Sequence, residues 1–504
     1  MPLYSAAFQF HSNTPPNMRV ALLPLLLLFT FLGAPPSNAI KVPLSARPRE
    51  GGRVRRMDML VGSTVLHGLG DIAYFCNISL GGIQHSAMID TGSSDFWVTK
   101  TVTDSKVLKV HAEIDYAMDS ASGPVQLANL MFDDLTILDQ AYCMSAYLSS
   151  NTNANISLVQ AKSSANLPAD ALIGLGPGSN SIIRLKLGNS TGDPPLDRIF
   201  GQTLSPKFIS VLLDRKAYDD DGMSNSLEHT GQLTIGEFIS GLEAVNNQPK
   251  LPALKDSGTG KPKHWQTTLD PDVSMLQIMF DMGFTFPQVP KEVADGIYGK
   301  VPGSVFAALG DNGIWTYPCD YELNVSLKLG GISYPVHSLD LGMPLPELDS
   351  NTCLATFQQR PGNFLDFADV DMILGAVFMH NTYTLVSFGD FVDGSSSNVS
   401  EPFIQLLSNT DVAGAHSDFV NLRLGGVDTT GTQAPLLPSI PRESRRSNEN
   451  LSSESDGGDN SEAKWSVSIV VSIVALAVLG SIILYLIVSQ LRSGYPCWQF
   501  GQHL

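Results

Sequence analysis

Asp90 and Asp281 each stand at the end of an apolar run and directly before a short turn. Asp90 lies in the stretch from Ala87 to Val98 (AMIDTGSSDFWV), and Asp281 lies in the stretch from Met275 to Pro290 (MLQIMFDMGFTFPQVP). If folding brings two carboxyl groups close together, they cannot both ionise, and they share one proton. The ionised carboxylate can then take a proton from a water molecule, while the protonated one donates its proton to a carbonyl oxygen.

Both stretches predict a buried strand that ends in a tight loop with the aspartate at its tip. Gly92 and Gly283 allow the backbone of each loop to approach another segment closely. A D-T-G turn alone is common between strands, where the aspartate only stabilises its own turn. The apolar residues before Asp90 and the sequence SSDFWV after it make the pattern much more specific. The second stretch repeats the layout of the first, which indicates an internal duplication at the level of the loop.

The stretch from Ala87 to Val98 resembles the first active-site loop of the pepsin-like (A1) aspartic proteases. The similarity covers about Ile72 to Gly389. It implies an all-β fold at about 57–389, with two similar β-barrel lobes and a cleft between them. We place the N-terminal lobe at about 57–225 and the C-terminal lobe at about 226–389. The resemblance implies that Asp90 and Asp281 are the catalytic pair, with support from the neighbouring residues Thr91, Gly92, Ser93, Gly283 and Thr285.

Tyr116 lies in the stretch AEIDYAMDSASG, which resembles the hairpin flap that closes over the cleft in this family. The resemblance implies that Tyr116 forms a hydrogen bond with Trp97 and that both residues contribute to substrate binding. The tip of the hairpin reads Y-A-M-D-S, where the family usually has Y-G-T-G-S. Ala117, Met118 and Asp119 therefore depart from the family pattern, so the mobility of the flap and the shape of the subsites beside it do not follow from the resemblance.

The cysteines are few, so a scaffold built from disulfides is excluded, although one or two pairs are compatible with the sequence. The contexts of Cys319 (YPCDYEL) and Cys353 (NTCLATF) resemble the disulfide of the second lobe in this family. Cys76 and Cys143 are the only cysteines of the first half, and they form the second expected pair if the thiols are oxidised.

The second loop departs from the family pattern at two positions. Met282 stands where a threonine usually links the two loops, and Phe284 stands where Ser93 stands in the first loop. A phenylalanine at the position of Phe284 resembles the sequence of fungal, membrane-anchored members of the family. Loss of one buried hydrogen bond can cost roughly 1–3 kcal/mol. Two interpretations stay open: an endopeptidase that cleaves proteins at acid pH beside apolar residues, with impaired activity, or an inactive cell-surface protein that binds peptides.

Two apolar segments predict the topology. The run from Val20 to Leu32 follows Arg19 and indicates a signal peptide at 1–39, with the true start at Met1 or Met18. The uncharged segment at 465–488 is long enough to span a bilayer as a helix, which leaves 489–504 as a cytosolic tail. These segments predict a single-pass membrane protein whose protease domain is extracellular or lumenal, at the cell surface or in the vacuole and secretory pathway.

Two further segments flank the predicted protease domain. The basic stretch at 40–56 ends in Arg55-Arg56 and is either a short pro-segment or a solvated basic turn. Residues 390–464 are rich in Ser, Asn, Gly, Pro and acidic side chains, which is typical of a disordered or glycosylated stalk. A secreted surface would also suit the glycosylation sequons, which stand at Asn77, Asn155, Asn189, Asn324, Asn398 and Asn450.

The charge of the chain limits its partners. The 504 residues carry a net charge of −18, so a phosphate-rich partner such as nucleic acid is not expected. The sequence has no metal-binding spacing, so we expect neither a metal ion nor a cofactor. The expected partners are a peptide or protein substrate and the membrane, and the expected assembly is a monomer.

Overall fold

The computed structural model describes residues 40–46, 73–116, 120–132, 135–148, 170–202, 206–215, 229–270, 276–309, 312–345, 351–360, 369–389 and 400–438. The predicted signal peptide, membrane helix and cytosolic tail lie outside these ranges, as do the flap-tip residues 117–119 and the sequons at Asn155, Asn398 and Asn450. Within the described ranges, no helix is both long and apolar enough to cross a membrane.

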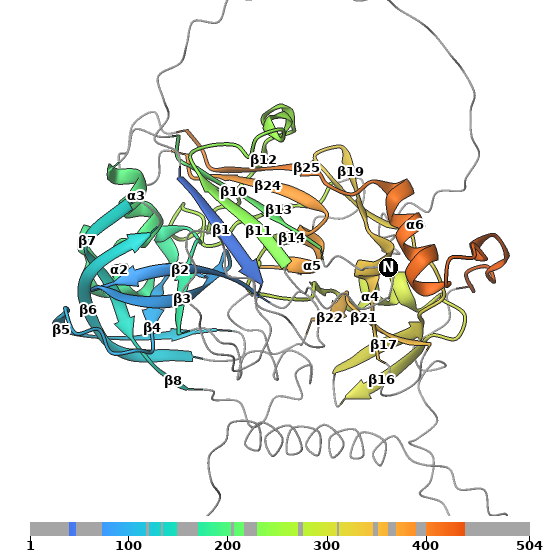
Figure 1. Ribbon diagram of the computed structural model, residues 1–504, viewed down its shortest axis with the longest axis horizontal. Coiled ribbons are helices and arrows are strands. Elements are labelled where there is room, and N and C mark those ends of the chain that lie inside the picture. Colours follow the sequence, from blue (N-terminus) through green and yellow to red (C-terminus); the bar gives the residue numbers. More distant parts are fainter. Residues whose placement is uncertain are drawn as a thin grey trace, which may run out of the picture.

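The first half of the described chain forms a lobe of curved, mostly antiparallel strands, on the left in Figure 1. The hairpin between its first two strands turns at Gly81 and Gly82, which have φ values of 54° and 79°. Only glycine adopts this left-handed backbone at little cost, so the G-G pair fixes the turn and the register of the hairpin. The strands of this lobe are β2 (Tyr74–Leu80), β3 (Ile83–Asp90), β4 (Phe96–Val98), β5 (Lys106–Asp115), β6 (Ser120–Phe132), β7 (Leu135–Met144), β8 (Ala146–Leu148) and β9 (Ala171–Gly174).

A run of six strands continues this sheet across the middle of the molecule (Figure 1). Their order is β12, β25, β24, β10, β11 and β1, after which β1 pairs with β2 of the first lobe. The strand β1 lies within the segment that we considered a pro-segment, and it pairs with β11 along its whole length. The bounds are β1 (Ile40–Ala46), β10 (Phe208–Leu213), β11 (His229–Ile235), β12 (Leu251–Pro252), β24 (Thr382–Ser387) and β25 (Phe403–Ser408).

The second half forms a lobe of three smaller sheets, on the right in Figure 1. The first sheet contains β13 (Gln266–Thr268), β14 (Gln277–Phe280), β15 (Gln288–Val289), β22 (Gln358–Gln359) and β23 (Met372–Leu374). The other two contain β16 (Val305–Leu309), β17 (Asn312–Pro318), β20 (Gly342–Pro344) and β21 (Thr352–Ala355), and β18 (Val325–Leu329) with β19 (Ile332–Val336).

The same three-strand unit occurs in both lobes. In the first, β3 runs parallel to β9, and β4 lies antiparallel on the other side of β9. In the second, β14 runs parallel to β23, and β15 lies antiparallel on the other side of β23. In each unit the first strand leads directly into one of the two aspartates. The internal duplication inferred from the sequence is therefore confirmed at the level of strand pairing.

The helices of the described residues are short, and five of them are α-helices. The cap of α2 is Ser181, whose Oγ accepts a hydrogen bond from Arg184 N at 3.0 Å, as is typical of a helix start. The α-helices of the described residues are α2 (Ile182–Leu187), α3 (Pro195–Gln202), α4 (Lys291–Tyr298), α5 (Ala376–Met379) and α6 (Val412–Arg423).

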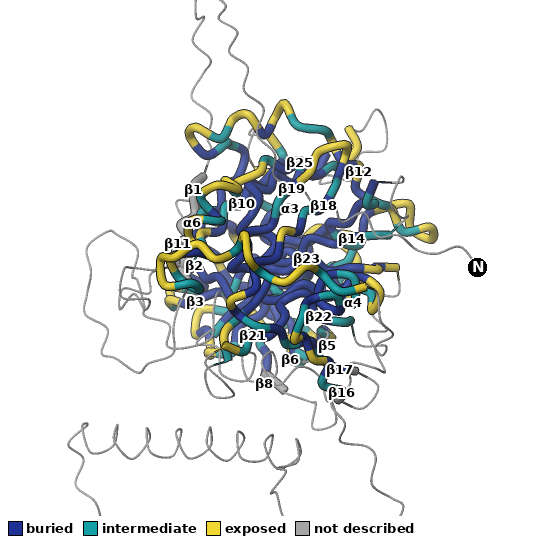
Figure 2. Tube along the Cα trace, turned by 90° about the vertical axis from the view of Figure 1, so that its right-hand side faces the viewer, coloured by how far each residue is buried: buried dark blue, intermediate teal, exposed yellow. Residues whose placement is uncertain are grey.

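The buried residues follow the inner strands, and the exposed ones lie mainly in outer loops (Figure 2). One cluster of buried hydrophobic side chains draws residues from both lobes, including Ile89 before the first aspartate and Phe280 before the second. Trp265, which is 1% exposed, belongs to this cluster, and its Nε1 donates a hydrogen bond to Leu175 O at 2.8 Å. The strands that carry the two aspartates therefore share one core.

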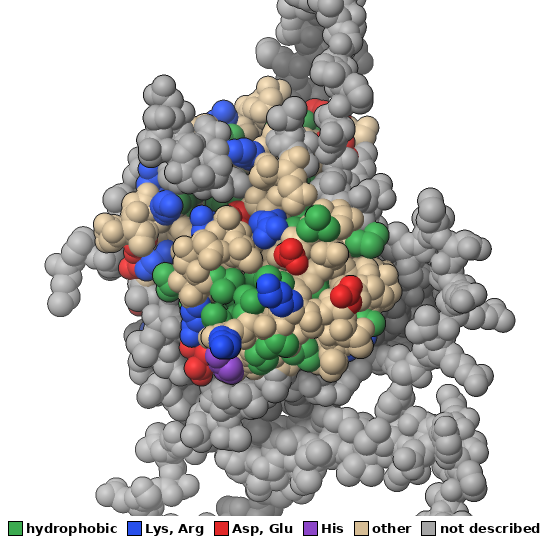
Figure 3. Space-filling view, turned by 90° about the vertical axis from the view of Figure 1, so that its left-hand side faces the viewer, with side chains coloured by type: hydrophobic (Ala, Val, Ile, Leu, Met, Phe, Trp, Pro, Cys, Tyr) green, Lys and Arg blue, Asp and Glu red, His purple; other side chains and the backbone are tan. Residues whose placement is uncertain are grey.

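The outer face of the first lobe differs from the acidic composition of the chain. In Figure 3 this face shows basic, acidic and hydrophobic side chains interspersed with one another. The elements β5, β7 and α2 of this lobe carry the exposed hydrophobic side chains Val107, Leu138 and Leu185. This face therefore carries side chains of both charges.

The folded body extends past Gly389, which corrects the predicted start of the stalk. Strand β25 pairs with β24 from Thr382 opposite Ser408 to Ser387 opposite Phe403. Helix α6 follows, and its Arg423 donates a hydrogen bond to Gly342 O at 3.0 Å. Residues 400–438 are thus part of the second lobe and the central sheet, although their composition resembled that of a linker.

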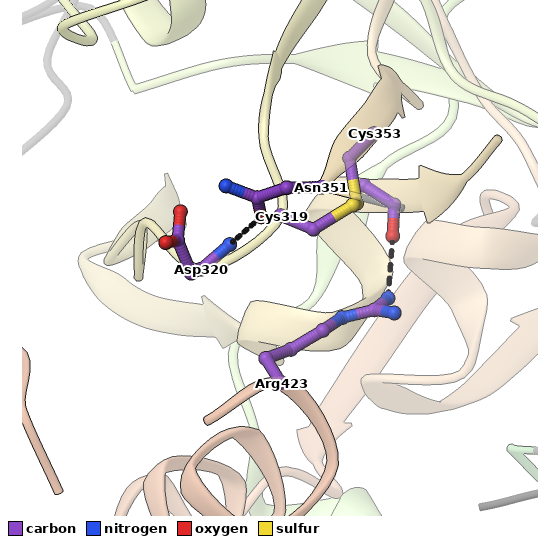
Figure 4. Close-up of a disulfide and its surroundings, with 6 residues drawn as sticks. Cys319, Asp320, Asn351, Cys353 and Arg423 are labelled. Carbon is purple, nitrogen blue, oxygen red and sulfur yellow. Dashed lines mark hydrogen bonds between the residues drawn. A yellow bond between two sulfur atoms is a disulfide. The ribbon is translucent and has the colours of Figure 1, made fainter. Parts of the chain in front are cut away.

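The cysteines match one expected pair and contradict the other. Cys319 and Cys353 form a disulfide, beside which Asp320 N donates to the Asn351 side chain at 3.1 Å and Arg423 approaches from α6 (Figure 4). The expected Cys76–Cys143 disulfide is wrong, because these two cysteines are free thiols. They pack in different hydrophobic clusters, and burial raises the pKa of each thiol to about 12.

Candidate active site

The two predicted aspartates meet where the lobes join. A Cβ atom built on Gly92 would lie 2.1 Å from Asp281 Oδ2, and one built on Gly283 would lie 2.5 Å from Asp90 Oδ1. Each loop therefore needs its glycine so that the carboxyl group of the opposite loop can approach. Asp90 is 5% exposed and Asp281 is 3% exposed, so the two carboxyl groups form a buried pair.

A strand from the same lobe supports each aspartate from behind. Leu175 N donates to Asp90 O at 2.7 Å, and Asp281 N donates to Leu374 O at 3.0 Å. Glycines are required at these crossings as well. A Cβ atom on Gly174 would lie 2.6 Å from Ser93 O, and one on Gly375 would lie 2.6 Å from Phe284 O. The backbone of each loop thus packs directly against a neighbouring strand. This close approach is possible because the residue at the crossing is a glycine.

The carboxyl groups receive unequal support from their own loops. Asp90 accepts hydrogen bonds from Gly92 N at 2.8 Å and from Ser93 Oγ at 2.5 Å. Asp281 accepts one from Gly283 N at 2.8 Å and is also held by the backbone of Phe284, but no hydroxyl group of its loop reaches it as Ser93 reaches Asp90. The side chain of Phe284 has no hydroxyl to offer and packs against a small cluster that contains Met279, Val370 and Ile373. Hydrogen bonds to a carboxylate stabilise its charged form, so the arrangement favours the negative charge on Asp90.

The pKa of Asp281 reflects the close pairing. Burial raises this pKa well above its ordinary value, and the charge of Asp90 and a hydrogen bond between the two carboxyl groups raise it further. Backbone hydrogen bonds from Gly283 and Phe284 oppose the shift. The pair therefore keeps one proton to a higher pH than an isolated aspartate would, and Asp281 is the better proton carrier.

A single threonine links the two loops. Thr91 Oγ1 donates to Phe280 O at 3.1 Å and accepts from Met282 N at 3.0 Å. Met282 is completely buried in the shared core, where its side chain can return neither bond. The resemblance implies a connection through two hydroxyl groups, and here it is made through one. Thr285, the other predicted supporting residue, is 6% exposed, and its carbonyl accepts from Val377 N at 3.1 Å.

The structure also brings the predicted flap residues together. Tyr116 follows β5 at the start of the hairpin tip, and Trp97 lies in β4 beside the first loop. Trp97 Nε1 donates to Tyr116 OH at 2.9 Å. Burial and the charges of Asp90 and Asp95 raise the pKa of Tyr116 well above its ordinary value. The phenol therefore stays neutral and can donate a hydrogen bond near the aspartate pair.

Two residues near the site were not predicted from the sequence. Asp95 accepts from Ser181 Oγ at 2.7 Å and from Ile183 N at 3.0 Å, so it ties the end of the first loop to the start of α2. Burial raises the pKa of Asp95. His264 lies with its Nδ1 3.2 Å from Gly92 O. The sequence signal for Asp95 was its place beside the loop, whereas nothing in the chain near His264 points to a partner so far away.

Other possible sites are few among the described residues. No group of three or more His, Cys, Asp or Glu side chains is placed to hold a metal ion in that part of the chain. A pocket of about 900 Å³ opens between α2, α3 and residues 259–262, with Asp197 and Arg184 in its wall. Neither Asp90 nor Asp281 lines this pocket, so it is separate from the aspartate pair.

Comparison with known proteins finds similar chains among the aspartic proteases. The family model for eukaryotic aspartyl proteases matches residues 73–391. Major aspartyl peptidase 1 of Cryptococcus neoformans is 25% identical over 382 residues, which cover 66% of this chain and 71% of that protein. An aspartic protease of Phaffia rhodozyma is 24% identical over 346 residues, or 64% of this chain and 75% of that protein. Penicillopepsin-3 of Penicillium janthinellum is 24% identical over 334 residues, or 62% and 76%. The crystal structure of an aspartic proteinase from Irpex lacteus aligns with a TM-score of 0.48 at 15% identity, over 74% of this chain and 98% of that one.

Proposed function

Because this chain belongs to the eukaryotic aspartyl protease family, we propose that it is an active endopeptidase in which Asp90 and Asp281 together activate a water molecule. The observation that carries the proposal is the pair of glycines, Gly92 and Gly283, whose missing side chains leave room for the opposite carboxyl groups. A chain that had lost the reaction would have no need to keep two buried carboxyl groups in contact, since their pairing is costly.

The reaction follows from the unequal support of the two carboxyl groups. Ionised Asp90 takes a proton from the water as its oxygen attacks the carbonyl carbon of the peptide bond. Protonated Asp281 donates its proton to the carbonyl oxygen, which gives a neutral tetrahedral diol. Asp90 then transfers the proton it gained to the leaving nitrogen, Asp281 recovers its proton from the diol, and the carbon–nitrogen bond breaks. The pair ends with one proton, as it began.

This mechanism sets the pH range. The pair must hold one proton, and the raised pKa of Asp281 keeps that proton bound above the range of an ordinary aspartate. Activity is lost as the pH rises through this pKa, and also at low pH when the second carboxyl group is protonated. We therefore expect an acid optimum. A preference for apolar side chains beside the cleaved bond is part of the same proposal and rests on the family.

A second candidate function rests on Met282. Its buried thioether adds no second hydroxyl to the link that Thr91 makes between the loops, which would suit a protein that binds peptides without cleaving them. We favour the endopeptidase, because the aspartates and their glycines are in place in spite of Met282.

Cleavage of a peptide library at acid pH separates the two candidates. The full chain should cleave peptides beside apolar residues, and a statine-type transition-state analogue should block the cleavage. Asp90→Asn should abolish it, whereas Asp256→Asn, in an exposed turn, should retain it. Peptide binding without cleavage by the folded wild type, and cleavage gained in Met282→Thr, would support the inactive protein instead.

We also propose that the protein follows the secretory route and is anchored by a single helix at 465–488. The Cys319–Cys353 disulfide supports this proposal, because disulfides persist in oxidising compartments. The sequon asparagines that the structure describes, Asn77, Asn189 and Asn324, are all exposed, as glycosylation would require.

Alkaline extraction of membranes tests the anchor: the full chain should stay in the pellet, and a chain that ends at residue 438 should be released. Treatment with an N-glycosidase should lower the apparent mass of the full chain.

A further inference from the structure

His264 contacts the first aspartate loop, although it comes from the other half of the chain. It stands directly before the buried Trp265, whose backbone carbonyl accepts from Phe280 N at 2.9 Å. Its ring Nδ1 lies 3.2 Å from Gly92 O. The N–H of the same Gly92 donates to Asp90. The ring is thus connected to the carboxylate of Asp90, which would act as the base, through the backbone of Gly92.

The partner of Nδ1 determines the protonation pattern of the ring. A backbone carbonyl can only accept a hydrogen bond, so Nδ1 must carry the proton whenever this bond is made. Neutral His264 therefore carries its lone pair on Nε2, and acid adds the second proton there. Protonation places a positive charge beside the loop without breaking the contact to Gly92.

The charged groups that act on this ring are known. Asp90 in the first loop and Asp369 before β23 favour the charged ring, as does the Gly92 carbonyl. Burial lowers the pKa of His264, and the neighbouring Lys263 lowers it further. The electrostatic interaction with Asp90 is reciprocal. The free energy by which the Asp90 charge stabilises the protonated ring is the same free energy by which the protonated ring stabilises the Asp90 charge.

We propose that protonated His264 stabilises the single negative charge of the Asp90–Asp281 pair and so keeps the pair in its singly ionised form at lower pH. The proposal rests on the proposed proteolytic function, because it gives the histidine a role in setting the acid limit of that reaction. His264 does not touch the reacting atoms in this account. It is a positioning residue, which acts on the pair through the Gly92 backbone and through its charge.

The first test follows the pH dependence of kcat/KM for the full chain and for His264→Gln, which keeps a side-chain donor but cannot carry a charge. The acid limb of the profile should move to higher pH by roughly 0.5–1 unit in the variant. His264→Phe should show the same shift together with a lower kcat, because it also loses the contact to Gly92. The matched control is His416→Gln on α6, far from the pair, whose acid limb should not move. An acid limb that stays in place in His264→Gln would overturn the proposal.

The second test does not depend on activity. The pKa of the His264 ring is measured by NMR on the chain labelled with ¹³C at histidine Cε1, and the resonance is assigned by its loss in His264→Gln. In Asp90→Asn this pKa should fall, since the negative charge that stabilises the ring is gone. An unchanged pKa would show that the ring and the pair are not coupled, and the proposal would be wrong. A wild type that cleaves nothing but shows the coupling would refute the proteolytic function alone and leave the electrostatic link standing.

Discussion

Replacing Thr91 with valine removes one hydroxyl group and keeps the shape of the side chain. That hydroxyl bonds Phe280 O and Met282 N in the opposite loop, at 3.1 and 3.0 Å. Both backbone groups belong to buried residues, so water cannot readily take the place of the lost partner. Each unpaired group costs roughly 1–3 kcal/mol, and the two together should lower the free energy of unfolding by about 2–6 kcal/mol.

The same change should impair cleavage. Met282 offers no hydroxyl that could maintain the link, so the loops in Thr91→Val would be held together by the shared core and the carboxyl pair alone. A misplacement of catalytic groups by about 1 Å can cost on the order of 100-fold in rate. We expect kcat to fall by about this factor.

Chemical denaturation and cleavage of one apolar peptide, both at acid pH, provide the assay. Thr91→Ser keeps the hydroxyl and is the matched control; it should stay within about 1 kcal/mol of the wild type and retain most of the activity. If Thr91→Val is as stable and as active as Thr91→Ser, the hydroxyl does not link the loops, and the reasoning from the two hydrogen bonds is refuted.

Three further changes test other parts of the structure. Burial raises the pKa of Asp197 to about 7, so the stability that its protonated carboxyl group contributes is present below pH 4 and lost as the pH rises through 7. The free energy of unfolding of the wild type should therefore fall, relative to that of Asp197→Asn, by up to about 4 kcal/mol between those pH values. Parallel curves of unfolding free energy against pH for the two proteins would contradict this. His416 Nδ1 lies 2.9 Å from the buried Glu322, which raises the pKa of His416. His416→Gln should lower the free energy of unfolding by about 1 kcal/mol at pH 5, and this difference from the wild type should shrink as the pH rises above 7. A difference that stays constant with pH would exclude the ion pair. Cys353→Ala opens a disulfide between cysteines 34 residues apart and should lower the free energy of unfolding by about 3–4 kcal/mol. Reduction of the wild type should reproduce this loss, and Cys76→Ala should not show it.

The local sequence sufficed to predict the two aspartate loops. Each consists of an apolar strand, an aspartate and a glycine at fixed spacing, and these features act over a few residues. The contact between Trp97 and Tyr116 was expected only because the stretch resembles a known family. Local patterns predicted the separate pieces, whereas the resemblance indicated how the pieces meet.

The errors arose where tertiary structure decides the outcome. Cys76 and Cys143 are both buried in the first lobe, but no local feature shows that they pack in different clusters. The polar composition after Gly389 hid the strand β25, whose pairing with β24 depends on a sheet edge supplied by the rest of the fold. A signal for α6 did exist, because Asp411 caps this helix by accepting from Gly414 N at 3.0 Å. The contact between His264 and Gly92 joins residues far apart in the sequence, and no periodicity could reveal it.

The rate of peptide cleavage by Asp281→Asn at acid pH tests the central claim most directly. The amide keeps the size of the side chain but can neither share nor donate the carboxyl proton. The account predicts that kcat/KM falls by at least roughly 10²–10⁴-fold while the protein stays folded and still binds a statine-type inhibitor, if more weakly. Cleavage by Asp281→Asn at the rate of the wild type would contradict the claim that Asp90 and Asp281 act together on the water.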